Sequence, residues 1–286
     1  MAKPSSYRDE NIAETFKQIL PGLLKIAAVV VAIGLVLWGV TKLTSSNDKQ
    51  FTYNEIKKPF DIVRPYNPSV GLADSKVVVL IVQDPQCPNC SIYDDIAKVV
   101  KNKYKDRVNF VTKFMPLENI HAFARAGSQA LYAAQKQGKF TEYSDLVFKE
   151  QSKLNLNQLD EWAKTVGLNV DQFKRDRADK EIDFWIASDV KDLNAVRLPA
   201  DAEHATPPQP GVEAGRLTGT PSTVIFVNGE VFDWWSGAAQ QEQLETAIEK
   251  ALTKVSGKTE SSSSSSVSSS SSKSTSTSSS SSVVAQ

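Results

Sequence analysis

The two cysteines of the chain lie between an apolar run and a helical pattern, and this order constrains the fold. Residues 77–82 are apolar and mostly β-branched, which is typical of a buried strand. Cys87 and Cys90 follow, and they are the only cysteines among 286 residues. Residues 91–103 then carry apolar side chains at helical spacing. A strand, a CxxC pair and a helix in this order indicate a redox site.

The chemistry of the pair follows from its place at the start of a helix. Only a thiolate attacks a disulfide, and the unpaired N–H groups of a helix N-terminus stabilise that anion. Cys87 is therefore the predicted nucleophile, and Pro88 suits the first helical position, where no N–H is needed. Cys90 is the predicted resolving cysteine, which attacks a mixed disulfide formed at Cys87. Together they would form a redox-active Cys87–Cys90 disulfide.

Two structural interpretations of the pair stay open. A structural disulfide across so short a loop would remove little entropy from the unfolded chain. A closed zinc site needs four cysteine or histidine ligands, and the chain adds only His121 and His204 to the cysteines. Neither histidine has ligand spacing from the pair, so we expect no metal site and no cofactor.

One apolar segment predicts a membrane-spanning helix. Residues 26–40 carry no charge, and with residues 20–25 they approach the roughly 20 residues that cross a bilayer. We predict an uncleaved, single-pass signal anchor at residues 20–43, because the segment lacks a small-x-small cleavage pattern. The lysines and arginines favour residues 1–19 on the cytoplasmic side. The alternative is a buried core helix of a globular protein.

Two polar segments flank one predicted domain at residues 71–257, which is long enough for a single core. Residues 44–70 are expected to be a spacer that ends in a short edge strand. Three apolar residues would form that strand: Phe60, Ile62 and Val63. Residues 258–286 are rich in serine and predict a disordered tail, because they cannot bury enough apolar surface to fold. Lys+Arg and Asp+Glu both number 33, so no basic face indicates nucleic acid as a partner.

The pattern within the domain predicts two halves around a helical insertion. The first half, β-α-β, combines the strand and helix around the cysteines with a strand at residues 107–114. The second half, β-β-α, begins with a hairpin around residues 228–229, the dipeptide Asn-Gly, and ends with a helix at residues 239–255. Residues 117–197 between the halves predict four helices. The proline-rich loop at residues 198–216 would be a gate for substrate or a passive surface segment, with His204 exposed to solvent.

Four motifs occur in this order: residues 84–90 (DPQCPNC), 114–117 (FMPL), 219–221 (GTP) and 228–229 (NG). In this order they resemble the DsbA-like thiol:disulfide oxidoreductases of the thioredoxin superfamily. The resemblance covers residues 75–252. It implies an α/β protein with the thioredoxin fold and a helical insertion.

The resemblance also implies the other half of the site. In this family the proline of the Gly-Thr-Pro step is cis and faces the CxxC pair, and the residue before it binds an extended substrate through its backbone. Pro221 and Thr220 match these positions, and the alternative is an ordinary trans proline that opens a strand. Asp84 matches an acidic position of the family and is predicted to accept the proton of Cys90. The alternative for Asp84 is a strand-end carboxylate in water.

The residues between the cysteines are expected to contact substrate as well. These residues are Pro88 and Asn89. The strongest oxidants of the family have histidine where this chain has Asn89, which carries no charge. We therefore expect a less stabilised Cys87 thiolate and a less oxidising pair than in those members.

Together with the predicted anchor, the resemblance implies an enzyme at the cell membrane whose catalytic domain is extracytoplasmic. Its substrates would be unfolded or extended secreted polypeptides, and a membrane redox partner, such as a quinone-linked oxidase, would regenerate its disulfide. A reductase or isomerase supplied by a membrane electron donor is the alternative within this class. A non-enzymatic adaptor, or a metal-delivery module using Met115 and His121, is the alternative from another class.

Overall fold

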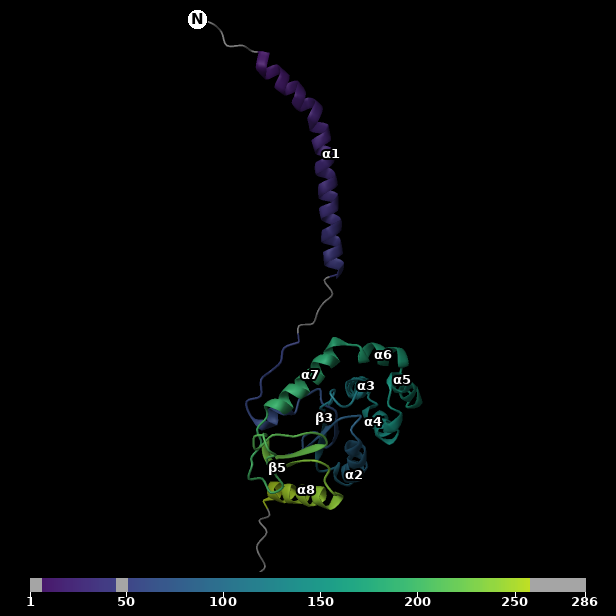
Figure 1. Cartoon of the computed structure of the whole chain (residues 1–286), viewed down its shortest axis with the longest axis vertical. Coiled ribbons are helices and arrows are strands. Elements are labelled where there is room, and N and C mark those ends of the chain that lie inside the picture. The colour runs from purple at the N-terminus through teal and green to yellow at the C-terminus, as the bar shows by residue number, and fades with distance from the viewer. Residues whose placement is uncertain (1–6, 45–50, 258–286) are drawn as a thin grey trace, which may run out of the picture. The chain divides into compact units, whose positions relative to one another are not determined.

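The computed structural model of the chain describes residues 7–44 and 51–257 (Figure 1). The chain divides into two units, Met1–Tyr53 and Asn54–Gln286. The predicted serine-rich tail lies outside the described residues. Residues 1–6 of the predicted cytoplasmic segment and residues 45–50 of the predicted spacer also lie outside them.

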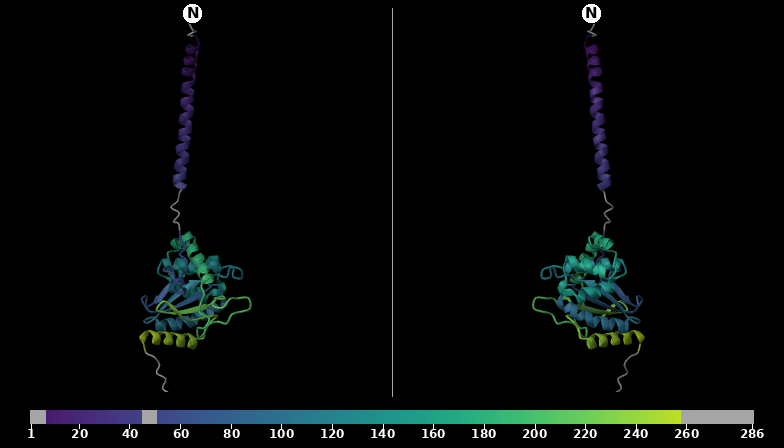
Figure 2. Two further views of the ribbon diagram at one scale, coloured as in Figure 1. Left: turned by 90° about the vertical axis from the view of Figure 1, so that its left-hand side faces the viewer. Right: turned by 90° about the vertical axis from the view of Figure 1, so that its right-hand side faces the viewer.

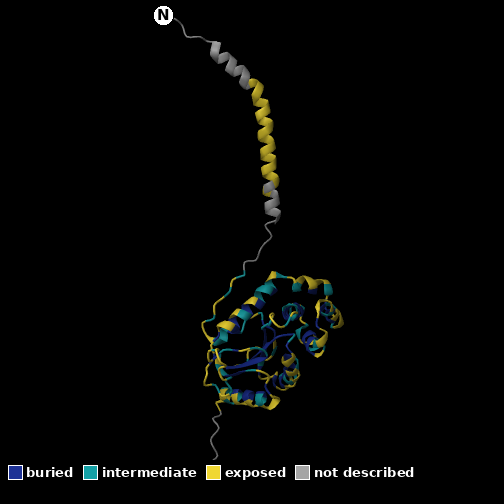
Figure 3. Cartoon of the chain, in the orientation of Figure 1, coloured by how far each residue is buried: buried dark blue, intermediate teal, exposed yellow. Residues whose placement is uncertain are grey.

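The first unit contains one long helix, α1 (Tyr7–Thr44). Within it, Lys17–Val36 is long and apolar enough to cross a membrane, with a mean hydropathy of 2.5. None of this stretch is buried, and its described side chains are exposed on all sides (Figure 3). A core helix of a globular protein is mostly buried, which this stretch is not. A signal sequence near the N-terminus passes the same test of length and composition.

A five-stranded sheet lies at the centre of the second unit, in the order β1-β3-β2-β4-β5. Its strands are β1 (Ser69–Gly71), β2 (Val77–Gln83), β3 (Asn109–Phe114), β4 (Ser222–Val227) and β5 (Glu230–Ser236). β2 runs parallel to β3, and the other neighbouring strands pair antiparallel. Asn228 and Gly229 connect β4 to β5 with φ of 52° and 81°. Both residues adopt the left-handed conformation that a tight hairpin requires, so the predicted hairpin is confirmed.

Helices cover both faces of the sheet. Every residue of the central strand β2 is therefore buried. Val77, Val79 and Ile81 pack against α2 (Pro88–Tyr104) and α8 (Gln241–Ser256). Val78 and Leu80 face the opposite side, where α7 (Lys180–Ala195), the 3-10 helix η1 (Pro59–Ile62) and the proline-rich loop pack. Figure 2 shows α8 on one side of the sheet and α7 on the other.

The helical insertion is confirmed, with five α-helices in place of the predicted four and one short 3-10 helix. It contains α3 (Ala124–Lys136), α4 (Phe140–Lys149), the 3-10 helix η2 (Gln151–Lys153), α5 (Leu156–Thr165), α6 (Val170–Arg177) and α7. The predicted last helix is interrupted because the side chain of Asp179 accepts the N–H of Glu181 and so begins α7. The predicted first helix starts later, at Ala124, because the preceding residues form a turn against the cysteine loop.

The domain begins before the predicted boundary at residue 71. Ile62 is completely buried, and the ring of Phe60 packs edge-on against Phe226 at 5.1 Å between centroids. The predicted edge strand over Phe60–Val63 is wrong, since η1 occupies this segment. The true edge strand is β1, which pairs with β3. Three closely spaced apolar residues fit a strand and a 3-10 turn equally well, so the pattern alone could not distinguish them.

A buried ionic cluster fastens α7 and the first residues of the domain to the sheet. We define this cluster as Arg64, Lys113, Asp189 and Asp192. The Nζ of Lys113, a completely buried side chain on β3, lies 2.8 Å from each aspartate. Arg64 pairs with Asp192 at 2.6 Å, and Tyr132 donates to Asp189. The two cations and two anions balance, as buried charges must.

Candidate active site

The cysteines lie at the N-terminus of α2, where the chain leaves the central strand. Cys87 is the N-cap of α2 and Pro88 is its first residue. The carbonyl of Cys87 accepts the N–H of Cys90 at 2.9 Å and that of Ser91 at 3.3 Å. The helix therefore starts at the pair itself, and the N–H groups of Asn89 and Cys90 lie beside the Cys87 sulfur.

The two thiols differ in burial and in acidity. Both are free, with Cys87 6 % exposed and Cys90 fully buried. The hydrogen bond from the Cys90 thiol is the main effect that lowers the pKa of Cys87 to about 5, against the opposing effect of burial. Thr220 and the N–H groups of Cys90 and Asn89 contribute further. Burial raises the pKa of Cys90, so the pair holds one thiolate and one thiol at neutral pH.

The Gly-Thr-Pro step meets the cysteines from the start of β4. The Thr220–Pro221 peptide bond is cis, which matches the arrangement implied by the resemblance and not an ordinary trans proline. The Sγ of Cys87 lies 3.4 Å from the carbonyl oxygen of Thr220. Pro88 and Asn89 are exposed beside this contact and are accessible to a partner.

Asp84 follows β2 and touches both cysteines through its main chain. Its N–H donates to the Sγ of Cys90 at 3.4 Å, and its carbonyl accepts the N–H of Cys87 at 3.1 Å. Its completely buried carboxylate accepts three hydrogen bonds: from the N–H of Gln86 at 2.7 Å, the N–H of Leu117 at 2.8 Å and the Nδ1 of His121 at 2.8 Å. The alternative of a strand-end carboxylate in water is therefore wrong.

His121 belongs to this site, although its place in the sequence suggested no role beyond that of a metal ligand. The turn that carries it follows β3, with the N–H of His121 bonded to the carbonyl of Leu117 at 2.9 Å. β3 lies beside β2 and runs parallel to it, so the segments that follow both strands meet at one edge of the sheet. That rule of parallel strands was the signal that could have placed His121 near Asp84.

The helical insertion also holds the cysteine loop, through residues that the sequence did not single out. Gln151 donates from its Nε2 to the carbonyl of Cys87 at 2.9 Å and to that of Pro85 at 3.0 Å. Gln86 accepts the N–H of Phe123 through its Oε1 at 2.6 Å. Phe148 packs against both cysteines. The insertion therefore fixes the loop from which Cys87 projects.

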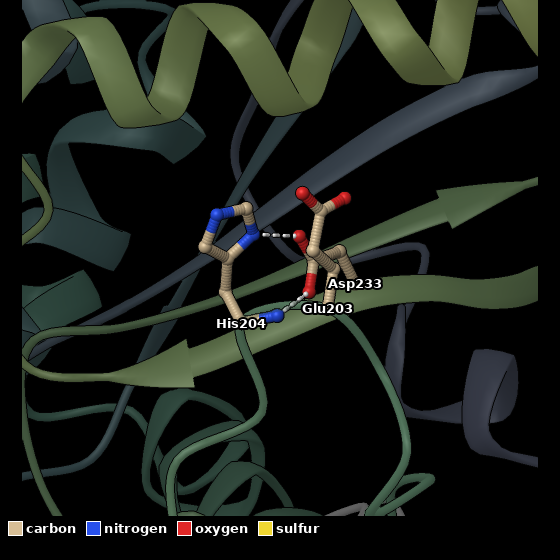
Figure 4. Close-up of side chains that lie close together, drawn as sticks. All are labelled: Glu203, His204 and Asp233. Atoms are coloured by element: carbon tan, nitrogen blue, oxygen red, sulfur yellow. Dashed lines mark hydrogen bonds and ion pairs between the residues drawn. The ribbon is translucent and has the colours of Figure 1, made fainter.

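A second cluster of ligand-type side chains lies away from the cysteines, where the proline-rich loop meets β5 (Figure 4). Glu203, His204 and Asp233 place their nearest ligand atoms within 4.8 Å of one another. Asp233 accepts the N–H of His204 at 2.9 Å, and its other oxygen lies 2.5 Å from the Nδ1 of His204. Glu203 pairs with Lys250 of α8 at 2.5 Å. Each of these side chains thus has a hydrogen-bond or ion-pair partner within the protein. His204 binds the loop to β5 and is not simply exposed to solvent, as the sequence had suggested.

Comparison with known proteins assigns the domain to a class. Residues 64–200 match the family model described as thioredoxin. The fold is similar to that of a thioredoxin-like oxidoreductase from Silicibacter pomeroyi DSS-3, with 21% identity, 68% of this chain and 98% of that chain covered, and a TM-score of 0.52. It is also similar to alpha-DsbA1 from Wolbachia pipientis, with 17% identity, 70% and 98% covered, and a TM-score of 0.55.

The chain thus carries a thioredoxin-like domain. The predicted thioredoxin fold is therefore confirmed, and the similar solved structures include proteins named as a thioredoxin-like oxidoreductase and as alpha-DsbA1.

The similar curated proteins are antiporters that are much longer than this chain. The Na(+)/H(+) antiporter NhaA 1 of Salinispora arenicola is 26% identical over 195 residues, which are 67% of this chain and 26% of the relative. The antiporter NhaA 3 of Salinispora tropica is 30% identical over 142 residues, 48% of this chain and 22% of the relative. The chain spans about a quarter of the length of these relatives.

Proposed function

We propose that this protein is a thiol-disulfide oxidoreductase that forms disulfide bonds in secreted polypeptides. The observation that carries the proposal is the Cys87 sulfur at the N-terminus of α2, with a pKa lowered to about 5. A thiolate of low pKa is a good leaving group. A mixed disulfide at Cys87 therefore breaks readily toward the substrate, which favours transfer of the disulfide out of the protein.

The reaction proceeds in two exchanges. A substrate thiolate attacks the Sγ of Cys87 in the Cys87–Cys90 disulfide, and Cys90 leaves and takes up a proton. A second substrate thiolate then attacks the substrate sulfur of the mixed disulfide, and Cys87 leaves as a thiolate. Two substrate thiols lose two electrons, and the cysteine pair gains them.

Asp84 is the proposed proton carrier for Cys90, because its own N–H bonds to the Cys90 sulfur. The buried thiol needs such a group, since its raised pKa makes the free thiolate costly. When Cys90 leaves, it takes up the proton that the attacking substrate thiol lost, relayed through the Asp84 carboxylate, and in the reverse reaction this carboxylate accepts the proton of Cys90.

The substrate segment binds in extended form beside Thr220 and Pro221. Thr220 offers its backbone, and Pro221 leaves that backbone without a competing N–H at the next residue. Pro88 and Asn89, both exposed, contact the same segment.

The apolar part of α1 supports a membrane anchor, with the domain on the extracytoplasmic side. A membrane redox partner, such as a quinone-linked oxidase, then reoxidises the cysteine pair. Use of the same pair for reduction or isomerisation requires a membrane electron donor instead.

The test is oxidation of a reduced, unfolded polypeptide by the full-length protein in detergent. The oxidised wild type should form the substrate disulfide stoichiometrically, and Cys87→Ser should form none. Mixed with a substrate that already carries a disulfide, Cys90→Ser should accumulate a mixed disulfide at Cys87, because the resolving thiol is missing. A wild type that reduces insulin yet leaves the reduced substrate unoxidised would contradict the proposed direction.

A further inference from the structure

The imidazole of His121 lies behind the cysteine pair and reaches it through one residue. Asp84 bonds to the sulfur of Cys90 with its N–H and to the N–H of Cys87 with its carbonyl. His121 bonds to the carboxylate of the same residue at 2.8 Å. A change at His121 therefore reaches both cysteines through Asp84.

The three donors to the Asp84 carboxylate differ in kind. Two are main-chain N–H groups, of Gln86 and Leu117, which the fold holds in place. The third, the Nδ1 of His121, belongs to a side chain that is 16% exposed, whereas the carboxylate is fully buried. His121 is thus the donor among the three that a side-chain substitution removes, and the one that can carry a positive charge.

The negative charge of Asp84 lies in a residue whose main chain contacts the sulfur of Cys90 and the N–H of Cys87. A carboxylate close to a thiolate disfavours it, and a donor or cation that binds the carboxylate weakens this effect. Asn89, in the motif itself, carries no charge that would help. We infer that His121 is a positioning residue that binds the Asp84 carboxylate and so keeps the Cys87 thiolate stable and the pair oxidising.

Only the expected effect of His121 on substrate oxidation rests on the proposed function. The Cys87 thiolate can be measured in the reduced protein without any substrate. Failure of the proposed function would appear as a wild type that does not oxidise substrate. Failure of this inference would appear as a Cys87 pKa that does not depend on His121.

Two substitutions of His121 test whether the hydrogen-bond donor at Nδ1 is sufficient without the imidazole ring. His121→Asn places an amide N–H close to the position of Nδ1, and His121→Gln places the same amide farther out, near the position of Nε2. Both side chains are polar and uncharged. His204→Asn is the matched control, because it alters the other histidine of the chain, which also binds a buried aspartate but lies away from the cysteines.

The readouts are the pH titration of thiolate absorbance in the reduced full-length protein and the equilibrium of the cysteine pair with glutathione. His121→Gln should lower the acid dissociation constant of Cys87 about three- to tenfold and make the pair easier to oxidise, hence more reducing. His121→Asn should restore most of the wild-type value, and His204→Asn should not differ from wild type.

Three results would overturn the inference. One is a Cys87 titration in His121→Gln that equals the wild type. Another is an equal shift of the Cys87 titration in His121→Asn and His121→Gln, which would show that a donor at the position of Nδ1 has no effect. The last is an equal shift in His204→Asn, which would show a general effect on the fold.

Discussion

Cys87 and Cys90 lie within one turn of α2, yet their surroundings differ. Cys87 retains contact with solvent and receives donors, whereas Cys90 is enclosed by protein. The sequence predicted this division of roles, because position at a helix N-terminus is visible in the order of strand, CxxC and helix. It did not single out His121 or Gln151. Parallel strands bring the turn of His121 near Asp84, but the contacts of both side chains depend on how distant turns meet the cysteine loop.

The acidity of Cys87 should depend on its partner thiol. The hydrogen bond from Cys90 is the largest cause of the lowered pKa of Cys87. Cys90→Ala should therefore raise the pKa of Cys87 above about 5 by roughly one unit or more. Cys90→Ser retains a hydroxyl donor and should show a smaller rise. Titration of the thiolate absorbance measures both, and equal values for the two variants would refute this cause.

The stability of the reduced protein should depend on pH through Cys87. Its pKa is about 5 in the folded protein and 9.0 as an ordinary thiol, so folding favours the thiolate. This contribution is complete above pH 9 and is lost as the pH falls through 5. The difference in unfolding free energy between reduced wild type and Cys87→Ser should therefore increase from pH 5 to pH 8. A difference that is independent of pH in denaturant titrations would contradict the lowered pKa.

At the scale of elements, β2, α2 and the β4–β5 hairpin were predictable because each has a strong local pattern. The first residues of the domain were not, since η1 and β1 gain their order from contacts with β3, β5 and α7. The ionic cluster could not be predicted from the sequence pattern either. Nothing near Lys113 in the sequence shows that a lysine within a strand faces two aspartates of a later helix.

Loss of the buried cation should destabilise the domain strongly. Lys113→Met would leave Asp189 and Asp192 with Arg64 as their remaining cation in the cluster, and removal of one partner of a buried pair costs about 3–5 kcal/mol. Chemical denaturation of the oxidised protein measures this loss. Lys103→Met is the control, because it removes an exposed ion pair with Glu245 and should cost far less. Equal losses in the two variants would contradict the role of burial.

At the scale of the whole molecule, the chain combines a redox domain with one long apolar helix. Composition alone indicated this helix, since 20 residues at a mean hydropathy of 2.5 have no polar face. The proposed anchor requires only that α1 enters a bilayer.

Charges in the middle of α1 should weaken membrane attachment. Each lysine at the centre of a membrane-spanning helix costs about 2.5–3.5 kcal/mol of insertion free energy. Val29→Lys combined with Val30→Lys should therefore shift the protein from the membrane fraction to the soluble fraction after alkaline extraction. Leu72→Lys, at an exposed apolar residue of the domain, is the control and should remain in the membrane. Release of the wild type under the same conditions would contradict the anchor.

The central claim is that the Cys87–Cys90 pair donates its disulfide, and the reduction potential of the pair in the full-length protein tests it most directly. A lowered Cys87 pKa stabilises the reduced form and raises the potential. We expect a value above that of thioredoxin, about −270 mV, and below that of the strongest oxidant of the family, about −120 mV. A value at or below about −270 mV would contradict the claim and favour a reductase.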